Sequence, residues 1–269
     1  MVMTRDRLSQ AIMQEILEGR DVEGGVVMDL SRASEHSLHR YGSLVGNPHD
    51  KAFIVSPTAH FCSGGVIIAE NAETRIPNLF AAGEICGGVH GANRIAGNAL
   101  SEAFAMGAIA GRNAALKAKE IDVPELPEAE IGSERARLEC FGPQGRERPS
   151  ELRRRLNEVM WVHAGIMRRG EDLEEALQEI EGLKARIPLL RAGDFRELIQ
   201  VLETGNMLTC AEMVCRAALL RTESRGGHYR SDFPGEDNDR WLKNITIRKQ
   251  DSEMRLEAIP VSMDFMGPL

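Results

Sequence analysis

The sequence predicts an α/β region followed by an α-helical bundle domain with a terminal β-hairpin. Up to about residue 120, short apolar runs alternate with glycine-rich turns, which is typical of short strands and close backbone packing. Beyond a Pro- and Glu-rich stretch, residues 133–220 are dense in Arg, Glu and Leu with a helical period. Two alternating runs on either side of Asp251–Ser252 then indicate a hairpin.

Length, charge and hydropathy exclude several classes of protein. At 269 residues the chain has enough material for one large or two modest domains. Its net charge of −8, with acidic and basic residues mixed, argues against non-specific nucleic-acid binding, which needs a basic face. No apolar run approaches the ~18 residues of a membrane span, and the first ten residues have no apolar core of the signal-peptide type.

Several common signatures are absent from the sequence. No G-x-G-x-x-G follows a predicted strand, and no H-E-x-x-H, G-x-S-x-G or Walker pattern is present, so the chain has no dinucleotide-phosphate cradle of its own. The cysteines are scattered, odd in number and form no C-x-x-C pair, which predicts reduced, mostly buried thiols in a cytosolic protein. They are Cys62, Cys86, Cys140, Cys210 and Cys215.

Hydrophobic periodicity and turn residues predict the elements of the first half. The first helix is expected at Thr4–Glu18, with Thr4 as its N-cap and Gly19 ending it. Beyond it we expect a strand at Gly24–Leu30, a helix at Ser34–Leu44, an extended segment at Ala52–Pro57, strands at 64–70 and Asn78–Ala82 around a turn at Asn71–Thr74, and a loop at Gly87–Gly91. A long helix at Asn98–Lys119 has a face of small residues suited to tight packing: Ala103, Gly107, Ala110, Gly111 and Ala114.

The second half predicts three helices of a bundle, at Ser150–Arg169, Asp172–Arg186 and Asp194–Leu220. Asp172 and Asp194 suit N-caps, and Pro188 interrupts the chain after the second helix.

The stretch Pro57–Leu116 contains the most specific motifs of the chain. PTAHF, then Gly-Gly, NLFAAGE and GGVHGANRIAGNAL resemble the flavoprotein subunit of succinate dehydrogenase and fumarate reductase, in the FAD-dependent oxidoreductase 2 superfamily that includes L-aspartate oxidase. TRDRLSQAI at Thr4–Ile12 resembles a helix of that family's capping domain. RTESRGGHYRSDFPGEDNDRW at Arg221–Trp241 resembles the signature of its C-terminal helical domain.

This resemblance implies a domain organisation. In the family, the nucleotide-binding half and most of the capping domain precede these motifs, so the chain is similar to the carboxy-terminal half of such a flavoprotein. Residues 1–50 correspond to the remainder of the capping domain and 51–120 to the C-terminal part of the FAD-binding domain. Residues 121–132 form a linker, and 133–269 form the helical C-terminal domain.

The resemblance also implies roles for three substrate-site residues. Arg5 falls at the family's proton-transfer arginine; since the pKa of a guanidinium is above ~12, it needs a relay of further charged groups to act as an acid. His60 and Arg94 match the residues that hold one substrate carboxylate, which suits a planar guanidinium fork and a histidine donor. From position alone, Arg5 would equally fit an exposed helix residue and His60 a core histidine bonded to backbone.

Four further residues match the family's flavin contacts. Glu84 matches an acid that contacts the ribityl chain of FAD. Asn98, Ala99 and Leu100 open the long helix, where the family places the pyrimidine edge of the flavin. A helix N-terminus offers free N–H donors and about +0.5 charge, so it suits the negative edge of a reduced flavin, and the side chain at 99 need not be polar.

Three features bear on partners and substrate. His60 is followed by Phe61, Cys62 and Ser63 where many relatives have Tyr and then Met, and the Gly87–Gly88 loop resembles the soluble fumarate reductases more than the membrane-complex enzymes. In 221–241, a cluster of Arg225, His228 and Arg230 beside acidic residues predicts a salt-bridged structural corner. Contact with a partner protein is the second interpretation of this cluster, ahead of a metal or nucleic-acid site.

The function implied by the resemblance is hydride transfer between FAD and a C4 dicarboxylate such as fumarate or succinate, in electron transport. The implied partners are a subunit that supplies the N-terminal FAD-binding half, or an iron–sulfur subunit. The implied location is cytoplasmic, at the inner face of the membrane through those subunits. Two alternatives stay open: an L-aspartate oxidase-like enzyme, and a non-catalytic or split-subunit fragment that needs a partner with the nucleotide-binding half. The sequence does not specify reaction direction, covalent flavin attachment or oligomeric state.

Overall fold

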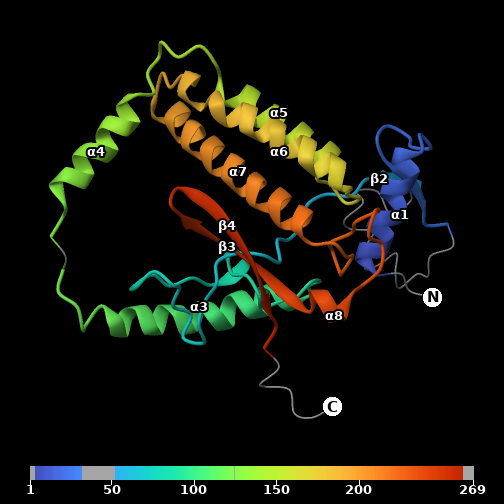
Figure 1. Ribbon diagram of the computed structural model, residues 1–269, viewed down its shortest axis with the longest axis horizontal. Coiled ribbons are helices and arrows are strands. Elements are labelled where there is room, and N and C mark those ends of the chain that lie inside the picture. Colours follow the sequence, from blue (N-terminus) through green and yellow to red (C-terminus); the bar gives the residue numbers. More distant parts are fainter. Residues whose placement is uncertain (1–3, 32–51, 124, 263–269) are drawn as a thin grey trace. The chain divides into compact units, whose positions relative to one another are not determined.

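A computed structural model describes residues 4–31, 52–123 and 125–262 of the chain (Figure 1). The chain divides into two compact units, Met1–Cys62 and Ser63–Leu269, which we call the first and second units. The helix expected at Ser34–Leu44 lies outside the described residues.

The first unit contains helix α1 (Arg5–Leu17) and the strands β1 (Val26–Asp29) and β2 (Ala52–Val55). The two strands pair antiparallel, with Val26 opposite Val55. The predicted helix and strands are therefore present with shifted ends. Thr4 occupies the N-cap position with an extended backbone, but its side chain makes no capping bond, so that part of the prediction is wrong.

In the second unit, residues 64–97 form an irregular segment in place of the two predicted strands. Residues 64–70 and Asn78–Ala82 make isolated bridges, Val66 to Cys86 and Glu73 to Phe80 among them, and a short 3₁₀ helix, η2 (Gly83–Ile85), follows. A strand is stabilised by a ladder of successive backbone hydrogen bonds to a neighbouring strand. In the described part of the chain, these runs form only isolated bridges instead. The apolar runs were correctly located, but their assignment as strands is wrong.

Helix α3 (Asn98–Lys117) confirms the predicted long helix. It packs on η2, where a Cβ added to Gly83 would lie 3.6 Å from the Cβ of Ala103. Further along the small-residue face Ala110 is buried, but nothing in the described structure lies within 4 Å of a Cβ added to Gly107 or Gly111, so the expected tight packing is present only in part. Helix α4 (Glu128–Glu139) follows; it has no buried residue and begins inside the stretch expected to be a linker.

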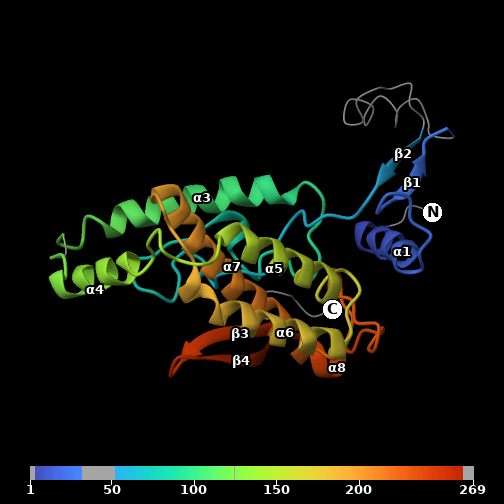
Figure 2. The same ribbon diagram turned by 90° about the horizontal axis from the view of Figure 1, so that it is seen from above.

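Helices α5 (Pro149–His163), α6 (Gly170–Ala185) and α7 (Phe195–Leu220) form the predicted bundle and lie side by side in both views (Figure 1, Figure 2). Apolar residues at helical spacing turn inward from all three and form the main core, which Leu190 and Ala192 extend. Its helical members are Leu152, Leu156, Val159, Leu173, Ala176, Ile180, Leu183, Val201, Leu208, Ala211, Cys215 and Ala218.

The ends of these helices test the predicted caps. Asp194 caps α7 by accepting a hydrogen bond from the N–H of Glu197 at 2.8 Å, as predicted. Asp172 is not a cap, because α6 begins earlier and Asp172 lies in its first turn. Helix α5 ends at His163, six residues before the predicted Arg169, and the 3₁₀ helix η3 (Ile187–Leu189) forms at Pro188.

A short helix, α8 (Asn238–Trp241), leads into the predicted hairpin of β3 (Lys243–Gln250) and β4 (Glu253–Pro260). Its two turn residues, Asp251 and Ser252, have φ of 51° and 67°. Positive φ at both central positions matches the right-handed twist of the strands, which explains the two-residue turn.

Three negative findings complete the fold, each for the described residues. None of their helices has the length and hydropathy needed to cross a bilayer. They contain no cluster of His, Cys, Asp and Glu side chains that could hold a metal ion. Every cysteine is a free thiol, as predicted, but Cys62, Cys140 and Cys210 are exposed, so the expectation of mostly buried thiols is wrong.

Candidate functional site

The predicted site residues fall in both units. Arg5, the first residue of α1, and His60, beyond β2, are exposed side chains of the first unit. Arg94 and the four predicted flavin contacts belong to the second unit. The assembly of Arg5, His60 and Arg94 around one substrate stays a prediction.

Within the second unit, Arg94 lies in a glycine-rich loop, residues 87–97, which we call the Arg94 loop. The side chain of Arg94 is half-buried, and its Nη1 donates to the carbonyl of Ile95 at 3.3 Å. The loop ends at Gly97, whose φ of 91° is a conformation that favours glycine and that turns the chain directly into α3. A guanidinium is thereby placed four residues before a helix N-terminus.

This N-terminus of α3 is open. Gly97 occupies its N-cap position, and no side chain caps the helix. Asn98 and Leu100 are exposed, and the described residues provide no acceptor for the backbone N–H groups of Ala99 and Leu100. Free N–H groups and the positive end of the helix dipole attract a negatively charged or acceptor-rich group. The geometry therefore suits the role predicted for residues 98–100.

Glu84 lies in η2, beneath the same end of α3. Gly83, which precedes it, is buried and has a φ of 80°, while the side chain of Glu84 is exposed. Its carboxylate is accessible to a ligand, in keeping with the predicted contact to the ribityl chain.

Glu102, in the first turn and a half of α3, was missed by the sequence analysis. Both of its carboxylate oxygens are buried, and neither has a hydrogen-bond partner among the described residues. Burial, together with the nearby Glu102 carboxylate, raises the pKa of the Cys86 thiol. A buried acceptor without a donor is rare in folded proteins, and an acidic residue inside a row of small apolar residues was the available sequence signal.

The Gly-Gly pairs have a structural function as well. Val66 joins two chain segments through its backbone: its N–H donates to the carbonyl of Ile85 at 2.8 Å, and its carbonyl accepts from the N–H of Gly87 at 3.0 Å. A Cβ on Gly65 would meet the carbonyl oxygen of Ile85 at 2.1 Å, and one on Gly87 would meet the nitrogen of Gly65 at 2.7 Å. These two glycines therefore allow the segments to touch and hold the base of the Arg94 loop.

Among the described residues, the buried carboxylate of Glu102 lacks a donor, the open N-terminus of α3 lacks an acceptor, and Glu84 in the neighbouring η2 is exposed. These three features fit a flavin, whose ring edge accepts hydrogen bonds and whose ribityl hydroxyls donate them. Asn98, Ala99 and Leu100 would hold the ring edge, and Glu84 would hold the ribityl chain.

A separate cluster lies in the helical domain at 221–237. Arg225 pairs with Glu223 at 2.9 Å, and Arg230 pairs with Asp232 at 2.6 Å, which confirms the predicted salt-bridged corner. The Arg230 guanidinium holds the pKa of Asp232 down at about 2. Burial, then the neighbouring Arg168 guanidinium, lowers the pKa of His228 to about 4.

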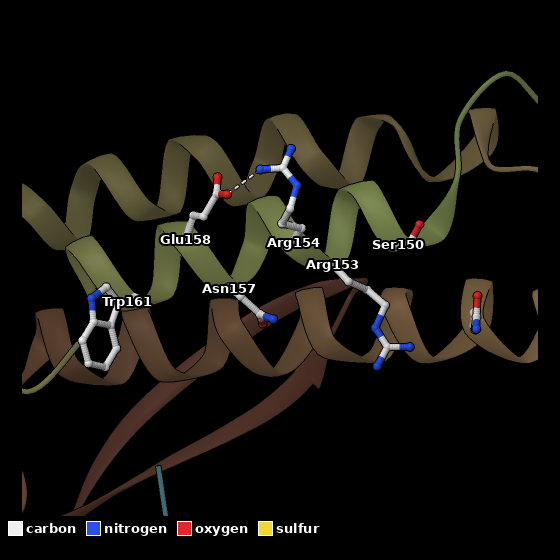
Figure 3. A pocket seen from close by; sticks show the side chains of 7 residues that line it. Ser150, Arg153, Arg154, Asn157, Glu158 and Trp161 are labelled. Carbon is white, nitrogen blue, oxygen red and sulfur yellow. Dashed lines mark hydrogen bonds and ion pairs between the residues drawn. The ribbon is translucent and has the colours of Figure 1, made fainter. Parts of the chain in front are cut away.

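A shallow hollow of about 530 Å³ lies along α5 and α7 (Figure 3). Its guanidinium groups are already paired, Arg154 with Glu158 at 2.5 Å and Arg153 with Glu203 at 3.1 Å. None of the predicted site residues lines it, so it is not the candidate site. The labelled side chains are Ser150, Arg153, Arg154, Asn157, Glu158 and Trp161.

Comparisons with known proteins identify related flavoproteins. Residues 2–100 match a family described as FAD binding domain, and residues 153–268 match one described as fumarate reductase flavoprotein C-term. Over 260 residues the chain is 39% identical to a subunit of the CoM/CoB fumarate reductase of Methanothermobacter marburgensis, covering 92% of this chain and 47% of the relative. Over 253 residues it is 38% identical to an uncharacterised FAD-dependent oxidoreductase of Methanocaldococcus jannaschii, covering 91% of this chain and 47% of the relative.

Among solved structures, a mutant FrdA chain of Escherichia coli quinol fumarate reductase superposes with a TM-score of 0.86 and 29% identity, covering 98% of this chain and 50% of that chain. This similarity confirms the predicted fold class. The matched family and the fold define the class of FAD-binding flavoproteins. The chain belongs to the family of fumarate reductase and succinate dehydrogenase flavoproteins. It spans about half the length of the curated relatives it matches.

Proposed function

We propose that this chain supplies the flavin-ring contacts and one carboxylate clamp of an FAD-dependent fumarate reductase or succinate dehydrogenase. One observation carries the proposal: the half-buried guanidinium of Arg94 lies four residues before the uncapped N-terminus of α3. The proposed carboxylate ligand and the proposed flavin-edge site thus belong to one unit and are four residues apart in the sequence. When bound, FAD supplies the redox chemistry, the exchange of a hydride with the substrate.

The residues of this chain then bind, orient and protonate. Arg94 and His60 hold one carboxylate of a C4 dicarboxylate, because a guanidinium fork and a histidine donor make charge-assisted bonds to it. Arg5 delivers or accepts the proton at the carbon next to the one that exchanges hydride. The protein contributes positioning and charge. Holding the substrate in a reactive orientation lowers the activation barrier, and no nucleophile in the protein is needed.

The partners follow from the same family. We propose that an iron–sulfur subunit, or a subunit that carries the nucleotide-binding half of the FAD site, joins this chain in electron transport. The assembled protein then lies on the cytoplasmic side of a membrane through its partner subunits. The Methanothermobacter marburgensis relative is named as one subunit of its fumarate reductase, which supports an assembly of several subunits.

The test is an Arg94→Ala variant of the assembled flavoprotein. We expect kcat/KM with fumarate or succinate to fall by at least about 10³-fold, because a charge-assisted contact to the reacting dicarboxylate is lost. Bound flavin, measured by its visible absorbance, should be retained. Arg112→Ala, which removes an exposed guanidinium further along α3, is the matched control and should leave turnover intact.

Unchanged turnover in Arg94→Ala would refute the clamp. Assaying the parent protein with fumarate, succinate and L-aspartate separates the proposed activity from an L-aspartate oxidase. Absence of flavin in the assembled protein would favour a non-catalytic role.

A further inference from the structure

We propose that the turn Arg225–His228 of the helical domain, which we call the Gly226 turn, positions the Arg94 loop for dicarboxylate binding. The inference rests on the proposed function, since it assigns the turn a part in that same site. In this role Gly226 is a positioning residue that acts through Arg94.

The contact joins two backbones. The N–H of Gly227 donates to the carbonyl of Ala92 at 3.0 Å, two residues before Arg94. Gly226 has a φ of 55°, and a Cβ on it would lie 2.3 Å from the carbonyl oxygen of Ala92. No real Cβ tolerates that distance, so the approach requires glycine at 226. At Gly227 an added Cβ would lie 3.8 Å from the same oxygen, which is an ordinary contact.

The Gly226 turn is held rigidly from its first residue. Arg225 and His228 exchange backbone hydrogen bonds of 2.8 and 2.9 Å, so Gly226 and Gly227 form the tip of a closed reverse turn. The guanidinium of Arg225 donates two hydrogen bonds of 2.9 Å to Glu223, whose side chain is fully buried. The buried carboxylate of Glu223 therefore helps to fix the position of the turn.

A second support comes from the bundle. Arg168, between α5 and α6, contacts Nδ1 of His228 at 3.1 Å. Its own backbone pairs with the segment that follows the turn through an isolated bridge to Arg230, and its carbonyl accepts from the N–H of Ser231 at 2.8 Å. The Gly226 turn is thereby bonded to the connection between α5 and α6 of the three-helix bundle.

The Arg94 loop, in contrast, is rich in glycine, and Gly91 beside Ala92 has a φ of 57°. The local bond from the N–H of Asn98 to the carbonyl of Ile95 closes the end of the loop without fixing it on another element. A carboxylate fork loses efficiency when it is displaced by about 1 Å, which can reduce turnover by roughly 10²-fold. Fixing Ala92 on the helical domain limits such a displacement at Arg94.

The test compares Gly226→Ala with Gly227→Ala in the assembled flavoprotein. The measurements are flavin content, kcat and KM with fumarate, and the Kd of malonate, a dicarboxylate without the adjacent carbon pair needed for dehydrogenation. We expect Gly226→Ala to weaken malonate binding and to lower kcat/KM by roughly 10- to 100-fold with flavin retained. Gly227→Ala keeps the N–H donor to Ala92, and its added Cβ has room beside the Ala92 carbonyl. This variant should therefore bind malonate like the parent.

A double-mutant cycle with Arg94→Ala separates positioning from a general structural role. If Gly226 acts through Arg94, adding Gly226→Ala to Arg94→Ala causes no further loss of malonate affinity. Additive losses, or equal malonate affinity in Gly226→Ala and Gly227→Ala, would overturn the inference. If Arg94→Ala alone leaves malonate binding unchanged, the clamp itself fails, which is a different outcome.

Should Gly226→Ala not fold, Gly226→Asn supplies the same Cβ with better tolerance of positive φ. It is expected to give the same weakened malonate affinity, and parent-like affinity in a folded Gly226→Asn variant would overturn the inference.

Discussion

The substitution Glu223→Gln tests whether the buried ion cluster stabilises the helical domain. The side chain of Glu223 is fully buried and accepts hydrogen bonds from Arg221, from two nitrogens of Arg225 and from the N–H of Asp237 at 2.8 Å. Burial alone would raise its pKa, but the donors from Arg225, Asp237 and Arg221 outweigh burial and lower the pKa below its ordinary value. The site is therefore built for a charged carboxylate.

Glutamine keeps the shape of the side chain but removes the charge and turns an amide NH₂ towards two guanidinium groups. Removing one partner of a buried pair typically costs about 3–5 kcal/mol, because the remaining charge is left unbalanced. Arg221 and Arg225 retain 14% and 21% of their side-chain exposure, so water relieves part of that cost. We expect a loss of about 3 kcal/mol in the free energy of unfolding.

The matched control is Glu236→Gln. Its carboxylate lies 3.9 Å from Arg225 and is 59% exposed. An exposed pair of this kind contributes at most about 0.5 kcal/mol, so the control should unfold almost like the parent.

Urea unfolding at pH 7, followed by tryptophan fluorescence and by far-ultraviolet circular dichroism, gives both free energies. Trp241 reports the cluster directly, since the Arg221 guanidinium lies 5.0 Å from its ring centroid. The pKa of Glu223 is lowered by folding, so its contribution is present above the unfolded pKa near 4.5 and is lost as pH falls through the folded value. Glu223→Gln should therefore weaken the acid dependence as well. A difference from the parent below about 1 kcal/mol at pH 7 would refute the reasoning.

Two further predictions concern His228 and the hairpin turn. The pKa of His228 is about 4 in the folded chain and 6.5 in the unfolded chain, so its contribution is full above pH 6.5 and declines by about 3 kcal/mol as pH falls towards 4. His228→Asn keeps an acceptor for Arg168 and should make the free energy of unfolding less dependent on pH between 6.5 and 4. If the variant showed the same pH dependence as the parent, His228 would be excluded as its source. Ser252→Gly should raise stability by roughly 1 kcal/mol in thermal unfolding, because it relieves a φ of 67°. The control, Glu253→Gly, lies one residue further on in β4 and should lower stability by roughly 0.5–1 kcal/mol. If both glycine substitutions changed the stability in the same direction, the result would contradict this account.

The helical bundle was predictable because its signal is local. Residues such as Leu152, Leu156 and Val159 repeat at helical spacing on one face, and all three are buried in the core. Asp194 caps α7 as predicted because an N-cap is also local: its side chain accepts a hydrogen bond from a backbone N–H only three residues further on. The hairpin likewise followed from alternation around Asp251–Ser252.

The irregular segment at 64–97 was less predictable because strands depend on partners. The run 64–70 has the composition of a strand, but in the described structure Val66 pairs with Cys86 alone, through a single parallel bridge. Whether an apolar run becomes a ladder is decided by residues far away in the sequence, and no local pattern records it.

The same distinction separates the site residues that sequence analysis found from those it missed. Arg94 and Glu84 were predicted as site residues because the motifs that contain them resemble those of a known family. Glu102 became significant when the structure showed its carboxylate buried without a donor. Gly226 has no side chain to notice, and its importance comes from one carbonyl, that of Ala92, 134 positions earlier in the chain. In 221–241 the charged residues predicted a salt-bridged corner, which the structure confirms. The part that we propose to act on the candidate site is the glycine between them, and no charge pattern indicates it.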